Sequence, residues 1–150
     1  MKPLITLIAV FALSIGISYV STGSAHLIFS GNLAMCVMLF FTAFGHYKFA
    51  RGMAMMVPAF IPFKIQLIYL SGIAEMVLGL ALLFPGLRSI AGIMLIAMFV
   101  LLLPANIYAA RKHINFETAT YDGKGPEYLW IRIPMQVLFI AWTLYFSVIK

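Results

Sequence analysis

The stretch "SGIAEMVLGL", residues 71–80, places a single glutamate, Glu75, inside an otherwise apolar run. The run extends over Ile65–Phe84, about the 20 residues that an α-helix needs to cross a bilayer. Gly72, Glu75 and Gly79 are spaced three and then four residues apart, so they share one face of that helix. Small residues beside a carboxylate indicate that this face meets protein rather than lipid. The stretch therefore predicts a membrane helix with a buried polar side.

The rest of the chain has the same apolar character. It has 150 residues, of which 64% are hydrophobic and 9% charged, whereas a soluble domain is about 45–50% apolar and about 25% charged. Long runs that are apolar on every side favour helices over the short alternating strands of a β-barrel. We expect one all-α transmembrane domain over residues 1–150, a helical bundle with five spans. The predicted spans are Leu4–Val20, Asn32–Phe49, Ile65–Phe84, Ile90–Ala110 and Leu129–Ile149.

The basic residues flank these runs and predict the orientation of the chain. With the N-terminus on one side, that side holds eight basic residues, and the other side holds only Arg88 and Lys150. Because cytoplasmic segments carry the excess of Lys and Arg, we expect a cytoplasmic N-terminus and an external C-terminus. The net charge of +6 therefore indicates a topology signal and contact with a lipid bilayer rather than binding of nucleic acid. The eight residues are Lys2, Lys48, Arg51, Lys64, Arg111, Lys112, Lys124 and Arg132.

Polar residues recur in the cytoplasmic halves of all spans except the first. This pattern predicts a four-helix core made of the second to fifth spans, with the helix at residues 4–20 packed outside. Ionisable groups inside a membrane usually face the bundle interior and pair. The residues are His46, Glu75, Asn106, Arg132 and Gln136.

Three interpretations of these residues are open. The first is a structural network, in which Glu75 pairs with Arg132, and Gln136 and Asn106 satisfy the remaining groups. The second is a polar pocket for a quinone or a lipid head group, since an apolar cavity with a few convergent polar groups is typical of a ligand site. The third is a proton or ion path that uses Glu75 and His46.

Four prolines indicate where regular helix is interrupted. Pro58 and Pro62 exclude a regular helix between the second and third spans and favour a segment at the membrane interface. Pro104 should free the carbonyl of Val100, which then needs a partner. Pro134 is tolerable if its helix begins close to it.

Several kinds of chemistry have no pattern in this sequence. Cys36 is the one cysteine, so no disulfide forms within the chain, and we interpret it as a small apolar residue. The three histidines are scattered over both sides, so no metal site is predicted. No residue is assigned a catalytic role, and whether the protein is an enzyme stays open. A quinone is the one cofactor that the polar pocket suggests.

Five motifs in order resemble the DoxX-like family of small bacterial membrane proteins: "FGHYKF", "VPAFIP", "SGIAEMVLGLALLFPGLRSIAG", "LLLPANIYAA" and "RIPMQ". The resemblance implies a compact bundle in the bacterial cytoplasmic (inner) membrane, associated with redox complexes. It also allows an accessory subunit that packs against a larger complex. The family core has four helices, and the helix at residues 4–20 departs from it. The family-pattern positions are His46, Glu75, Pro104, Asn106, Arg132 and Gln136.

Overall fold

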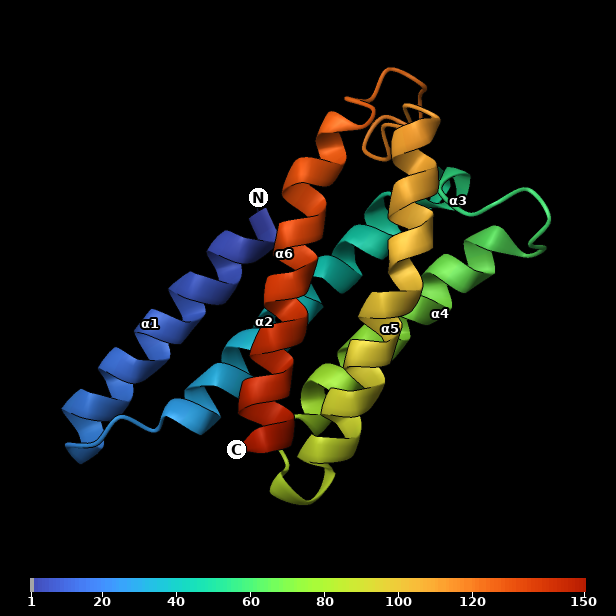
Figure 1. The fold of residues 1–150 in the computed structure, drawn as a ribbon. Helices are drawn as coiled ribbons and strands as arrows, with labels where there is room; N and C mark the ends of the chain where they lie inside the picture. Colours follow the sequence, from blue (N-terminus) through green and yellow to red (C-terminus); the bar gives the residue numbers. More distant parts are fainter. Residues whose placement is uncertain (1) are drawn as a thin grey trace.

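The computed structural model describes residues 2–150, and most of them are helical (Figure 1). Within these residues the only extended pairing is an isolated bridge between Asn115 and Thr120. Five helices are long and apolar enough to cross a membrane, which confirms an all-α multi-pass bundle. The elements are α1 (Lys2–Thr22), α2 (Leu27–Lys48), α3 (Ala50–Met55), α4 (Lys64–Ala81), α5 (Pro85–Arg111), α6 (Glu127–Thr143) and the π-helical η1 (Leu144–Ile149).

Successive long helices run in opposite directions, with short connections after α1 and α4 and longer ones after α2 and α5 (Figure 1). The end of α2 therefore lies at the same end of the bundle as the start of α4, the end of α5 and the start of α6. We call this the basic end, because all eight residues of the predicted cytoplasmic side belong to it. Its position on the cytoplasmic face stays a prediction.

α1 lies at one edge of the bundle, where it packs along α2 (Figure 1). Leu7 reaches the core and is fully buried, and the ring of Phe11 meets Trp142 edge-on at 4.8 Å between centroids. Most of the remaining surface of α1 is exposed. The helix therefore packs outside the other four spans, as the distribution of polar residues predicts.

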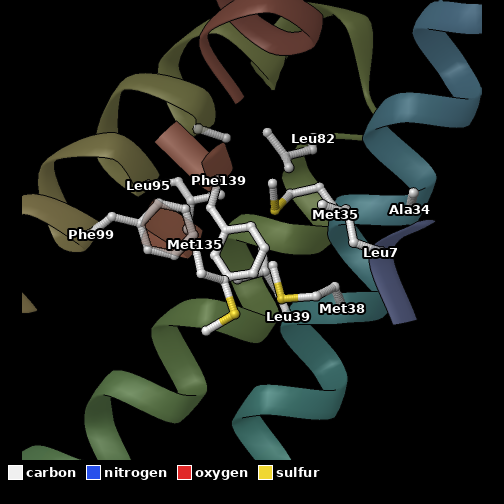
Figure 2. Close-up of a cluster of buried hydrophobic side chains, with 11 residues drawn as sticks. Leu7, Ala34, Met35, Met38, Leu39, Leu82, Leu95, Phe99, Met135 and Phe139 are labelled. Carbon is white, nitrogen blue, oxygen red and sulfur yellow. The ribbon is translucent and has the colours of Figure 1, made fainter. Parts of the chain in front are cut away.

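The apolar core fills the space between α2, α4, α5 and α6, as Figure 2 shows. Met35, Met38 and Leu39 of α2 meet Leu95 of α5 and Phe139 of α6. Flexible methionine side chains suit the irregular gaps between crossing helices. On α2 this core lies between two positions that are also buried but polar, Asn32 and His46.

The prolines occupy three kinds of position. Pro58 and Pro62 lie in the irregular segment between α3 and α4, as predicted. Pro85 begins α5, where its missing N–H costs nothing, so this helix starts five residues before the predicted span at residue 90. Pro104 and Pro134 lie inside α5 and α6. α6 begins at Glu127, two residues before the predicted span and seven before Pro134, so this proline lies in the helix interior, where neighbouring helices make it tolerable.

Candidate functional site

The functional candidate in this bundle is the interface between α2 and α4 around Glu75. Gly72, Glu75 and Gly79 are all buried, which confirms that this face of α4 meets protein. A Cβ atom at Gly72 would lie 3.0 Å from the Cβ of His46, tighter than ordinary contact. Glycine at this position therefore lets α4 approach α2 closely enough for the side chains of Glu75 and His46 to meet.

Each carboxyl oxygen of Glu75 contacts one side chain of α2. The Thr42 hydroxyl donates a hydrogen bond to Oε2 of Glu75 at 2.8 Å, and Nε2 of His46 lies 3.4 Å from Oε1. Glu75 is 3% exposed and His46 is 8% exposed, so water has little access to the pair. The predicted pairing of Glu75 with Arg132 is wrong, because the helix that packs against this face of α4 is α2.

The hydrogen bonds of His46 determine how many protons the pair holds. Nδ1 lies 3.1 Å from the carbonyl oxygen of Ile68, which can only accept, and 2.9 Å from the Ser71 hydroxyl. Ser71 itself donates to the Ile68 carbonyl at 2.8 Å, so its oxygen is free to accept. Nδ1 therefore carries a hydrogen.

With Nδ1 protonated, a neutral His46 ring would direct a lone pair at the Glu75 carboxylate. One further proton between Nε2 and Oε1 removes this repulsion, either as imidazolium with carboxylate or as neutral ring with carboxylic acid. The pair is electrically neutral overall in both forms, and that suits a buried site in a membrane, where a lone charge is costly. Chemically, the pair can hold, accept or release one proton.

Arg132 lies near this pair but outside direct contact with it. The side chain is half-buried, and its guanidinium lies 6.0 Å from the centre of the Tyr128 ring. Because Arg132 is in the second turn of α6, its long side chain can reach the basic end of the bundle.

Asn106 and Gln136 form a separate cluster between α5 and α6. The Asn106 amide donates to Oε1 of Gln136 at 3.2 Å, and the Gln136 amide donates to the carbonyl of Phe99. This carbonyl is the neighbour of the Val100 carbonyl that Pro104 was expected to free. The five predicted residues are thus divided among two interfaces and the half-buried Arg132.

Two clefts lie elsewhere on the molecule. One, of about 640 Å³, lies at the basic end between the α3–α4 segment, the start of α4 and Tyr108 of α5. The other, of about 380 Å³, lies between the α2–α3 junction and the loop at residues 116–119. None of the five predicted pocket residues lines either cleft. The side chains around Glu75 therefore fill one another's hydrogen bonds, and the clefts open at the surface.

A second buried polar cluster lies at the opposite end of α2. The Asn32 amide donates to the carbonyls of Ile28 and Phe146 at 2.8 and 2.9 Å, and its oxygen accepts from the Ser147 hydroxyl at 2.7 Å. The Phe146 carbonyl belongs to the last turn of η1, where carbonyls lack helical partners. Asn32 therefore terminates the last helix, and Trp142 adds a bond to the carbonyl of Gly31 at 3.0 Å.

The sequence contained a signal for part of what was missed. Thr42 precedes His46 by four residues, and Ser71 precedes Glu75 by four, so each hydroxyl lies on the same helix face as the ionisable residue of its own helix. Asn32 and Ser147 have no such signal, because they are far apart in the chain and neutral.

No group of three or more His, Cys, Asp or Glu in residues 2–150 is arranged to hold a metal ion. Cys36 is buried in α2. The polar residues of the bundle interior offer carboxylate, imidazole, amide and hydroxyl groups to one another across helix interfaces.

A family model described as "Domain of unknown function (DUF8561)" matches residues 35–147. The match covers most of the chain. The chain belongs to this family. The matched region begins within α2 and ends within η1, so the DUF8561 region contains both members of the His46–Glu75 pair and the Asn106–Gln136 cluster, and α1 precedes it. No curated protein and no solved structure matches the chain.

Proposed function

We propose that the protein is a non-catalytic accessory subunit of a larger membrane complex, of the DoxX-like type that is associated with redox chemistry. The observation that supports this proposal is that the polar side chains of the interior bond to one another and to the backbone. Glu75, His46, Asn106 and Gln136 bond to one another and to the backbone across helix interfaces. Such contacts fix the geometry of a bundle, and they leave its outer surfaces for binding.

α1 supports a docking role. It precedes the region shared with the family, contacts the bundle chiefly through α2, and leaves Leu13 and Ile17 65% and 68% exposed on one face. A helix at the edge of the bundle, outside the region that the family model matches, offers a surface for a neighbour in the membrane. The redox association rests on the resemblance of the five motifs to DoxX-like proteins.

A quinone-binding membrane protein is the second candidate, and the His46–Glu75 pair favours it. Reduction of a quinone consumes protons, and this pair brings two ionisable side chains into contact, with Nε2 3.4 Å from Oε1. A quinone would have to reach the pair between α2 and α4, where Gly72 already holds the helices in close contact. A proton or ion path is a weaker third candidate, since a relay would need further titratable groups in line with this pair.

The test is gentle extraction of the full chain from its native membrane, followed by native mass spectrometry. An accessory subunit should co-purify with other membrane subunits in a fixed ratio. A monomer that carries one bound quinone per chain, with no protein partner, would reject this proposal and support the second candidate.

Two matched variants locate the docking surface. Ile17→Trp adds bulk to the exposed face of α1, and Ile93→Trp adds the same bulk to α5, where the side chain is 55% exposed. If α1 docks the partner, the first variant should lose the co-purifying subunits, and the second should keep them. Equal retention in both variants would exclude α1 as the docking helix.

A further inference from the structure

The 640 Å³ cleft at the basic end has the composition of a site for an amphipathic anion. Lys64 is the only charged residue that lines it, and no acidic residue does. Met55, Val57 and Ile65 supply apolar lining, and Tyr108 and Tyr121 supply hydroxyl donors. The volume lies within the range of about 300–1,000 Å³ that is typical of small-ligand pockets.

The Lys64 ammonium lies at this cleft, and only one of its N–H groups has a partner within the protein. Nζ donates to the carbonyl of Val57, another lining residue, at 3.0 Å, which uses one of its three N–H groups. This bond fastens the irregular α3–α4 segment across the start of α4. The ammonium is thereby positioned beside the cleft before any ligand arrives.

Exposed aromatic side chains place the cleft at the level of lipid head groups. Phe60 and Phe63, in the segment that leads into Lys64, are 84% and 72% exposed, and Tyr121 is 69% exposed. Large aromatic residues concentrate at the boundary between head groups and acyl chains. The basic residues of this end attract anionic lipid, at about 1 kcal/mol for each Lys or Arg near the surface.

We propose that this cleft binds the head group of an anionic phospholipid, with the phosphate at Lys64 and the acyl chains along the apolar lining. The charge complementarity between a lone lysine and a phosphate selects this occupant over a neutral one. The inference is independent of the accessory role, since a lipid can occupy the cleft whether or not the protein docks a partner.

The experiment measures binding of phosphatidylglycerol to the purified full chain in a neutral detergent, by native mass spectrometry, with phosphatidylcholine as the comparison. Wild-type protein should retain phosphatidylglycerol preferentially. Lys64→Gln should weaken this binding about fivefold, the equivalent of about 1 kcal/mol. Lys64→Arg should preserve it, and Tyr108→Phe, which removes only a hydroxyl, should weaken it less.

Lys150→Gln is the matched control, because it removes one positive charge at the other end of the chain. If it weakens binding as much as Lys64→Gln, the attraction is a property of net charge and the site is rejected. Equal retention of phosphatidylcholine, or preferential binding of a neutral quinone, would also overturn the proposal. Full competition by millimolar inorganic phosphate would identify a phosphate site rather than a lipid site.

Discussion

α2 carries two buried polar clusters that differ in chemistry. At one end Asn32 bonds to Ser147 and to two backbone carbonyls, and every group involved is neutral. At the other end His46 meets Glu75, with Thr42 and Ser71 as hydroxyl partners. The apolar core of Met35, Met38 and Leu39 lies between them (Figure 2).

The two clusters differ in whether they contain ionisable groups: the Asn32 cluster has none, and the His46–Glu75 cluster has two. The donors and acceptors of Asn32 match its partners with no proton left to assign, so the cluster has a single form. The His46–Glu75 pair brings an imidazole and a carboxyl group together, and both are ionisable. The first cluster therefore has no titratable group, whereas the second contains two in contact with each other.

The largest expected effect comes from breaking the His46–Glu75 pair. His46→Leu or Glu75→Leu should each lower the free energy of unfolding by about 3 kcal/mol, because truncating one partner leaves the other buried and unpaired. The double variant should lose clearly less than the sum of the two single losses. Unfolding titrations in mixed micelles measure all three values.

Asn106→Leu provides the control for this cycle, because Asn106 belongs to the separate α5–α6 cluster. Its effect should add to that of Glu75→Leu. If His46→Leu and Glu75→Leu were equally additive, the two residues would not act as a pair.

Removal of the neutral cluster should have the next largest effect. Asn32→Leu deletes two hydrogen bonds to η1 and one to the carbonyl of Ile28 in its own helix. Because interhelical bonds in membranes average about 0.6 kcal/mol each, the expected loss is at least about 1 kcal/mol. Ser147→Ala deletes only one of the three and should cost about 0.6 kcal/mol. The same unfolding titration compares them, and equal losses would show that Asn32 does not link α2 to η1.

Two glycines on one face of α4 give a finer comparison. At Gly72 a new Cβ would lie 3.0 Å from the Cβ of His46, whereas at Gly79 the nearest atom, Cδ1 of Leu39, would lie 3.4 Å away. Gly72→Ala should therefore displace the ring of His46 and cost about 1 kcal/mol through overpacking.

Gly79→Ala should be close to neutral, because ordinary contact is offset by the higher helix propensity of alanine. Unfolding titrations and the NMR shifts of the His46 ring measure both variants. An equal response of that ring to the two substitutions would contradict the close approach at Gly72.

The smallest expected effect is a change in the pKa of Asp122, an exposed carboxyl outside the membrane-spanning helices, whereas Glu75 is buried within them. The Thr120 hydroxyl donates a hydrogen bond to Asp122 and holds the pKa of this exposed carboxyl below its usual range. The associated stabilisation is therefore present above the unfolded pKa and is lost as pH falls through the folded pKa.

Thr120→Val should raise the pKa of Asp122 toward its ordinary value, as NMR titration of the carboxyl carbon would show. Ser24→Ala, in the connection between α1 and α2, should leave that titration unchanged. An unchanged pKa in Thr120→Val would show that the hydroxyl does not control this carboxyl.

Much of the architecture could be predicted from local pattern. The run around Glu75 predicts a spanning helix with Gly72 and Gly79 on its buried face, because helix periodicity is a property of neighbouring residues. Span ends were less accurate: the prediction placed the second span at Asn32, whereas α2 begins at Leu27 and buries Asn32 completely. Asn32 is polar and its partners are far away in the chain, so the sequence suggested a position at the membrane interface rather than a buried one.

The residues predicted to form one polar site lie at two separate helix interfaces, and the reason is again that the sequence does not specify long-range neighbours. Depth along each helix can be estimated from sequence, and His46, Glu75, Asn106 and Gln136 were placed together on that basis. Depth does not specify which helix faces which. The rotation and neighbour of each helix decide that Glu75 meets α2 and that Gln136 meets α5.

The sequence by itself determined that this chain is an apolar, five-span helical protein with a carboxylate on a protein-facing surface, because composition and periodicity act locally. Only the tertiary structure decided that His46, rather than Arg132, contacts Glu75. That choice depends on the close approach of α2 and α4 at Gly72, which brings together side chains that are far apart in the chain.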